Sequence, residues 1–259
     1  MTTALTVICL TAFFAAILTF FSGFGLGTLL SPVFMIFFPV DVSIALTGIV
    51  HFFNNLFKLT LVGKNADKRV LLKFGVPAIL ASLLGAWMLL RLSDLTPLFS
   101  YAIKNRIMVV YPMKFVIALL LLFFSAMDLI PALSNLRFSK DKLIIGGALS
   151  GFFGGLSGNQ GALRSAFLIK SGLTKEAYLG TAVVVSCFVD FTRLGVYSSH
   201  FFEKGLSVHY PLIICATLSA MTGAYLGNRL FKKVTLRFIQ LTVAVLLLVI
   251  ALGLGSGLL

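Results

Sequence analysis

Long apolar runs follow one another along nearly the whole chain, and they constrain its fold more than any other feature. A helix of about 20 apolar residues crosses the hydrocarbon core of a bilayer. Only 11% of the 259 residues are charged, whereas soluble domains carry about 25%. The sequence therefore predicts an all-α, polytopic transmembrane helical bundle. The candidate spans are 3–22, 26–38, 42–62, 70–92, 108–131, 143–156, 161–172, 176–198, 207–230 and 236–256.

The basic residues gather in short loops between these spans. A net charge of +13 would suggest a nucleic-acid partner in a soluble protein, but the positive-inside rule explains it here. We therefore expect no nucleic-acid partner, three cytoplasmic loops, and both termini on the other side of the membrane. The loop residues are Lys64, Lys68 and Arg69, then Arg137, Lys140 and Lys142, then Arg229, Lys232, Lys233 and Arg237.

Three apolar segments, 26–38, 143–156 and 161–172, are too short to cross a bilayer alone. Short, glycine-interrupted segments are typical of broken or re-entrant helices in transporters. The loop charges place both ends of 143–172 in the cytoplasm, so we predict a re-entrant hairpin there. The chain then divides into two inverted repeats, 1–131 and 143–259, joined by a cytoplasmic linker, 132–142. The sequence leaves open whether 3–38 forms a hairpin or full spans.

Weak internal similarity also indicates a repeat. The segment FSGFGLGTLLSP (21–32) precedes one predicted helix, and GGLSGNQGALRSAF (154–167) precedes another. Gly27 aligns with Gly161, and Thr47 with Thr181, at a separation of 134 positions. Further along, Arg91 aligns with Arg229 at a separation of 138. The matches keep their order, as two copies of one unit would.

Each glycine segment is a candidate binding loop. Unwound backbone at membrane depth is tolerated where it is buried in protein or lines a wet cavity, and helix N-termini there can hold an anion. Close helix packing is the alternative role for such glycines, and we favour it for Gly147 and Gly151. The predicted substrate-binding residues of the two loops are Gly25, Gly27, Thr28, Asn159, Gln160 and Gly161, followed by Arg164.

Two predicted helices carry matching polar stripes inside the membrane. His51, Asn55 and Lys58 are spaced by four and three residues, and so are Ser186, Asp190 and Arg193, which places each set on one helical face. Such residues are expensive in lipid and normally line a bundle interior. We interpret Asn55, Lys58 and Arg193 as substrate-binding, and His51 and Asp190 as proton-coupling candidates.

Simpler explanations remain open for three of the charges. Lys58 could extend to the membrane surface. Asp190 and Arg193 could form an ion pair that only neutralises itself. Arg164 could be a cytoplasmic anchor.

The sequence shows no catalytic motif. Neither His-Glu-x-x-His nor Gly-x-Ser-x-Gly occurs, and the eight acidic residues lie mostly in loops. We therefore predict no enzymatic activity, no metal and no cofactor.

Four segments resemble the sulfite exporter TauE/SafE family, and together they extend over nearly the whole chain. They are FSGFGLGTLLSPVF, Ala45-Leu46-Thr47, GFFGGLSGNQGALRSAF and Gly180-Thr181-Ala182. The resemblance implies a multi-pass permease of the bacterial inner membrane that moves sulfite, sulfonates or related anions. It also implies functional loops at Gly25–Thr28 and Gly158–Gly161. Two departures, Asn159-Gln160 in place of a frequent glycine run and Ala166 in place of a proline, bear on the substrate more than on the fold.

We therefore predict a secondary transporter that binds a small anion between the two glycine loops, with the lipid bilayer as its other partner. A membrane enzyme would need a nucleophile or metal site, and a non-transporting scaffold would have no reason to place matched polar stripes in the membrane. A passive anion channel differs only in mechanism. A homodimer remains open.

Overall fold

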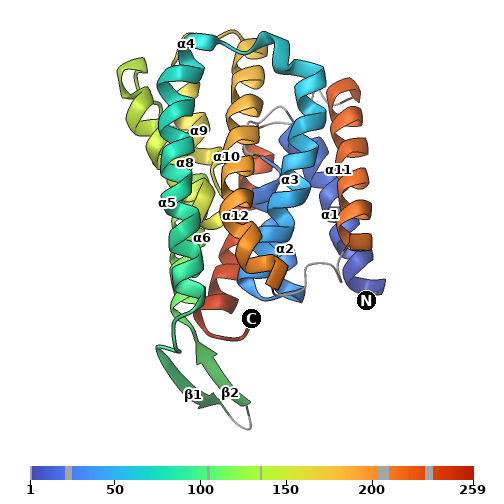
Figure 1. The fold of residues 1–259 in the computed structure, drawn as a ribbon, viewed down its shortest axis with the longest axis vertical. Coiled ribbons are helices and arrows are strands. Elements are labelled where there is room, and N and C mark those ends of the chain that lie inside the picture. Colours follow the sequence, from blue (N-terminus) through green and yellow to red (C-terminus); the bar gives the residue numbers. More distant parts are fainter. Residues whose placement is uncertain (1, 21–24, 104–105, 135, 204–209, 231–235) are drawn as a thin grey trace.

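The computed structural model is a bundle of long helices with a small β-hairpin at one end (Figure 1). It describes residues 2–20, 25–103, 106–134, 136–203, 210–230 and 236–259. Six of its helices are long and apolar enough to cross a membrane, which confirms the predicted polytopic helical bundle. The elements are α1 (Thr2–Thr19), α2 (Gly27–Phe37), α3 (Val40–Val62), α4 (Lys68–Val70), α5 (Val76–Ser93), β1 (Phe99–Ile103), β2 (Arg106–Val110), α6 (Pro112–Leu129), α7 (Pro131–Ser134), α8 (Leu143–Ser157), α9 (Gly161–Leu168), α10 (Lys175–Glu203), α11 (Tyr210–Leu230) and α12 (Leu236–Gly255).

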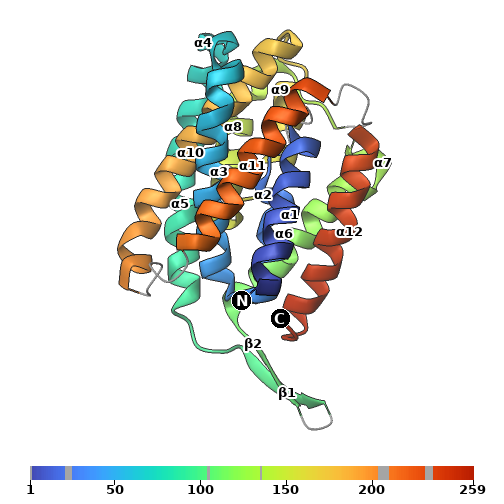
Figure 2. The same cartoon turned by 90° about the vertical axis from the view of Figure 1, so that its right-hand side faces the viewer.

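The two ends of the bundle differ in what they carry. One end, called here the α4 end, holds α4 and the basic turns Gly63–Asn65 and Lys140–Lys142. The other, the hairpin end, holds β1, β2 and both chain termini (Figures 1 and 2). This arrangement agrees with the predicted grouping of the termini on one side. The third basic loop lies partly in 231–235, outside the described residues.

Two helical hairpins enter the bundle from opposite ends. Helix α8 starts at the α4 end and α9 returns toward it, and the Phe138 amide near their outer ends donates to the Ala166 carbonyl at 3.1 Å. Helix α1 starts at the hairpin end and α2 returns to it (Figure 1). The segment 143–172 is thus a re-entrant hairpin, as predicted. Helices α1 and α2 likewise run in opposite directions, as a second helical hairpin of reversed orientation, and α1 is long and apolar enough to cross a membrane.

Glycines let the backbones of α5 and α8 come into direct contact. A Cβ atom added at Gly147 would lie 2.1 Å from the Phe74 carbonyl oxygen, and one added at Gly151 would lie 2.0 Å from that of Ala78. No larger residue fits at such distances, which is the reason for small residues at membrane helix interfaces. The packing role favoured for Gly147 and Gly151 is therefore confirmed.

The same kind of contact recurs between α1 and α11. A Cβ atom at Gly223 of α11 would lie 2.2 Å from the carbonyl oxygen of Phe13, and one at Gly85 of α5 would lie 2.1 Å from that of Phe152. Gly85 and Gly223 are 138 positions apart, and Phe13 and Phe152 are 139 apart. The bundle therefore contains equivalent interfaces in its two halves, while the exact boundaries of the repeats remain a prediction.

The predicted start of the fifth span, 108–131, is wrong. We expected a helix from residue 108, but Arg106–Val110 form a strand that pairs antiparallel with Phe99–Ile103. Helix α6 begins at Pro112, because proline lacks an N–H and is well suited to the first helical position. The Tyr101 hydroxyl donates to the Ser256 carbonyl and so ties the hairpin to the end of α12.

Candidate functional site

A buried ionic cluster joins α3 to α10 where these two helices pack together in the middle of the bundle. His51 Nδ1 lies 2.6 Å from Asp190 Oδ2, and the Asn55 amide donates to the same oxygen at 3.1 Å. The Arg193 guanidinium binds the other oxygen, with Nη2 at 2.9 Å. Asp190 and Arg193 are both 0% exposed. The two polar stripes thus face each other and meet at one carboxylate.

Lys58 does not extend to the membrane surface, which contradicts the simplest alternative for this residue. Its side chain is 4% exposed, and its Nζ lies 5.4 Å from the centre of the Phe20 ring. Arg164 is buried as well, and its guanidinium donates to the Ser186 hydroxyl. An exposed cytoplasmic anchor is therefore not the role of Arg164.

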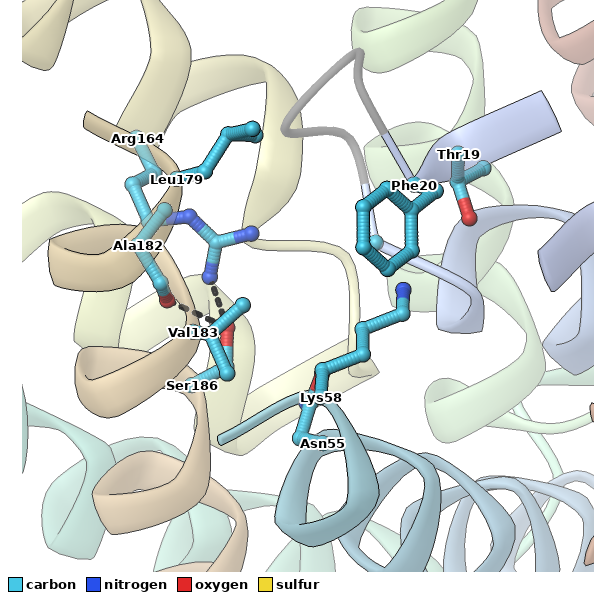
Figure 3. Close-up of a pocket in the computed structure, with 10 residues that line it drawn as sticks. Thr19, Phe20, Asn55, Lys58, Arg164, Leu179, Ala182, Val183 and Ser186 are labelled. Carbon is cyan, nitrogen blue, oxygen red and sulfur yellow. Dashed lines mark hydrogen bonds between the residues drawn. The ribbon is translucent and has the colours of Figure 1, made fainter. Parts of the chain in front are cut away.

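Lys58 and Arg164 extend into one pocket from opposite sides (Figure 3). Gly25, Asn55 and Ser186 line the same pocket. Its cavity volume is about 20 Å³, which suffices for a water molecule. An anion larger than water would enter only if the pocket widened. Two fixed positive charges in a narrow buried space favour an anionic occupant.

The first glycine segment shapes one wall of this pocket. Gly25 has φ +85°, a left-handed conformation that glycine adopts without steric cost. A Cβ atom there would lie 3.1 Å from His51 Nε2, so the histidine ring reaches the chain break itself. The Thr28 hydroxyl donates to the Gly25 carbonyl at 2.9 Å and holds the turn. Residues 21–24 of this segment lie outside the described residues.

The second glycine segment touches the first. Gly158 also has a positive φ, +77°, and its carbonyl oxygen lies 3.2 Å from where a Cβ atom on Gly27 would be. A Cβ atom on Gly158 would lie 2.8 Å from Arg193 Nη1. Helix α2 begins at Gly27 and α9 at Gly161, and neither has a side-chain cap. Two uncapped helix N-termini, each a source of positive potential, therefore start beside the ionic cluster.

Several buried polar side chains near these breaks make no hydrogen bond within the described part of the chain. They include both amide groups of Asn159 and Gln160 and the hydroxyl of Thr47. Buried polar groups are nearly always hydrogen-bonded, to protein, water or ligand. Water or a polar ligand between the breaks would satisfy these groups.

The structure brings the predicted site residues together in two groups. Gly25, Asn55, Lys58 and Arg164 share the pocket, whereas Arg193 and Asn159 lie at the second break. Sequence reasoning missed Phe20, which covers Lys58. Nothing in the sequence distinguishes Phe20 from the rest of the 26 phenylalanines. Among the described residues, no group of three or more His, Cys, Asp or Glu side chains could hold a metal ion.

Comparison with known proteins gives one match. The family model described as sulfite exporter TauE/SafE matches residues 8–254. No curated protein and no solved structure matches the chain. The family match includes both glycine breaks, both polar stripes and the helices that hold them, and it implies a membrane transporter of sulfur anions. The chain belongs to the sulfite exporter TauE/SafE family.

Proposed function

We propose that this protein is a secondary transporter that moves a small sulfur oxyanion, sulfite or a sulfonate, across the bacterial inner membrane. The substrate binds between the two glycine breaks. The helix N-termini at Gly27 and Gly161, with Lys58, Arg164 and Arg193, provide its positive surroundings.

The charge balance of the buried site is the observation that carries this proposal. Lys58, Arg164 and Arg193 are all buried, and Asp190 is the one acidic residue of the cluster among the described residues. Each cation costs about 2.5–3.5 kcal/mol at the centre of a membrane helix. An anion of one or two negative charges would offset that cost, because opposite charges attract strongly where water is excluded.

His51 is suited to couple transport to a proton. Its Nδ1 faces the Asp190 carboxylate at 2.6 Å, so this nitrogen carries a hydrogen that it donates. Its Nε2 faces the Gly25 turn. A neutral ring presents a lone pair at Nε2, whereas a protonated ring donates a hydrogen bond from it. We propose that His51 takes up a proton at Nε2 when the anion arrives and releases it when the anion leaves.

A passive anion channel is the mechanistic alternative. A continuously open pore would expose its polar lining to water, but Lys58, Arg164 and Arg193 are each buried. Buried binding groups favour a carrier that changes shape during each cycle. A homodimer remains a prediction that cross-linking in the membrane would test.

The test is flux into liposomes that contain the purified protein. Sulfite and a short-chain sulfonate should be transported, whereas acetate and a sugar should not. A pH gradient should drive sulfite uptake in the wild type, and His51→Gln should lose this dependence. Lys140→Gln, an exposed basic residue of the α4 end, is the matched control and should keep it. Absence of sulfur-anion flux in the wild type would refute the proposed function.

A further inference from the structure

The buried polar groups lie on both sides of the pair formed by His51 and Asp190. Lys58 follows His51 by two turns of α3, toward the α4 end. Leu179, which lines the same pocket, lies next to Gly180, where the turn at Gly63–Asn65 packs against α10. The pocket of Lys58 and Arg164 is therefore on the α4 side of the pair.

Arg193 lies on the opposite side of the pair, toward the hairpin end. A Cβ atom on Gly48, one turn of α3 before His51, would lie 3.4 Å from Arg193 Cζ. A Cβ atom on Gly27 would lie 3.7 Å from Thr47 Cγ2 and 3.2 Å from the Gly158 carbonyl oxygen, and one on Gly158 would lie 2.8 Å from Arg193 Nη1. Thr47 and Arg193 therefore flank the second glycine break, and Asn159 and Gln160 follow Gly158 in the chain. We call Thr47, Asn159, Gln160 and Arg193 the hairpin-side cluster.

The polar side chains of this cluster are fully enclosed and unsatisfied. Thr47 and Asn159 are each 1% exposed and Gln160 is 2% exposed. The Thr47 hydroxyl and both side-chain amides have no hydrogen-bond partner within the described residues. A buried polar group without a hydrogen-bond partner is costly, because it has lost its bonds to water and gained none in return. Three residues of this kind in and around the second glycine break, which Arg193 also reaches, favour a site for a polar ligand that donates and accepts hydrogen bonds.

The internal repeat relates the two sides. Lys58 and Arg193 are 135 positions apart, as are Asn55 and Asp190. The repeat therefore provides one cation on each side of the central pair, and each cation lies beside a glycine break. The pocket at Lys58 has room for a water molecule, whereas every residue of the hairpin-side cluster is at most 2% exposed.

We propose that the transported anion occupies two subsites in turn. The first is the pocket of Lys58, Arg164 and Ser186, reached from the α4 end. The second is the hairpin-side cluster, reached from the hairpin end when the protein changes shape. The His51–Asp190 pair separates the two subsites, and only one of them is open at a time. This inference rests on the proposed function and specifies where the anion binds at each stage.

The experiment uses two variants of the hairpin-side cluster and one of the Lys58 pocket. Thr47→Val and Asn159→Ala remove buried polar groups that make no hydrogen bond in the structure, so the folded protein loses no bond. Both variants should keep the thermal stability of the wild type or exceed it. Lys58→Gln tests the other subsite, and Lys140→Gln is again the control. Sulfite uptake is measured in oriented membrane vesicles, once with substrate at the α4 end and once with substrate at the hairpin end.

The two-subsite arrangement predicts an effect that depends on the side of the membrane. Thr47→Val and Asn159→Ala should raise the apparent substrate constant about tenfold for sulfite added at the hairpin end, and change it far less at the α4 end. Lys58→Gln should show the reverse.

Equal effects from both sides would indicate one site and overturn the inference. Unchanged constants in Thr47→Val and Asn159→Ala would also overturn it, because the cluster would then be structural. Wild-type vesicles without sulfite flux would instead refute the proposed function itself.

Discussion

Helices α3 and α10 have polar residues at equivalent positions of the two repeats, yet the residues differ in charge. Helix α3 carries His51, Asn55 and Lys58, and α10 carries Ser186, Asp190 and Arg193. Two identical stripes would place like groups against each other when the helices pack. Instead, Asn55 donates to its own repeat equivalent, Asp190, and His51 binds the same carboxylate. The repeat thus fixes where polar groups lie, and the divergence between its copies makes them complementary.

The two glycine breaks also combine an equivalent backbone with different side chains. Both contain a glycine with a positive φ, Gly25 and Gly158, so the backbone turns are alike. Polar side chains, Asn159 and Gln160, occur in the second break, whereas the described part of the first relies on Thr28 and its backbone. One break therefore carries side-chain amide groups that have no hydrogen-bond partner among the described residues, and the other places its backbone against His51.

Among the changes proposed here, removal of the shared Asp190 carboxylate should lower stability and flux the most. Asp190→Ala leaves Arg193 and His51 buried without their partner, and breaking a buried ion pair costs about 3–5 kcal/mol. We expect a strongly lowered melting temperature in detergent and no flux. The double variant Asp190→Asn/Arg193→Gln should recover part of the stability that either single change loses. Additive losses would show that the two residues act independently.

The second prediction concerns glycines that let two helix backbones touch, one in each half of the bundle. A Cβ atom at Gly85 would lie 2.1 Å from the Phe152 carbonyl oxygen, and one at Gly223, its equivalent in the other half, would lie 2.2 Å from that of Phe13. Alanine at either position should destabilise the protein by about 1–3 kcal/mol because of overpacking, measured by thermal unfolding.

Gly195→Ala is the control for these two variants. An added Cβ atom at Gly195 of α10 meets nothing within 4 Å, and alanine favours a helix over glycine by up to about 1 kcal/mol. This change should be neutral or slightly stabilising. If only one of Gly85→Ala and Gly223→Ala destabilises the protein, the two interfaces are not equivalent.

The third prediction separates backbone strain from a role at the site. Gly25→Ala and Gly172→Ala both place alanine at a positive φ, +85° and +83°, and each should cost about 1–2 kcal/mol. An added Cβ atom at Gly172 meets nothing within 4 Å, whereas one at Gly25 lies 3.1 Å from His51 Nε2. Both variants should therefore lose similar stability, and only Gly25→Ala should lose flux. If Gly25→Ala and Gly172→Ala had the same flux, the substrate would not bind beside Gly25.

The smallest expected effect concerns two basic residues close together on the chain. Arg164 is buried beside Ser186, and Lys170 is exposed just beyond α9. Arg164→Gln should raise the apparent sulfite constant about tenfold, equivalent to the loss of roughly 1.4 kcal/mol of binding. Lys170→Gln should leave it unchanged, because a hydrated charge contributes little. Equal constants in both variants would remove Arg164 from the proposed site.

The site residues were predictable to different degrees. Lys58, Asp190 and Arg193 stood out in the sequence because charges in apolar helices are expensive and rarely accidental. The unsatisfied state of Thr47 and Asn159 was not predictable, because a missing hydrogen bond depends on every neighbour in space. Phe20 was missed for a similar reason, since its contact with Lys58 depends on where α1 ends.

The sequence by itself determined the membrane-spanning helices, the two breaks and the polar stripes. Each depends on hydrophobicity, spacing and glycine content over at most about twenty consecutive residues. Only the tertiary structure decided that His51 meets Asp190, 139 positions away, and that Lys58 turns into a pocket instead of toward the membrane surface. It also decided that residues 106–110 pair as a strand with 99–103. These outcomes depend on which helix faces pack together, and that choice rests on contacts between residues far apart in the chain.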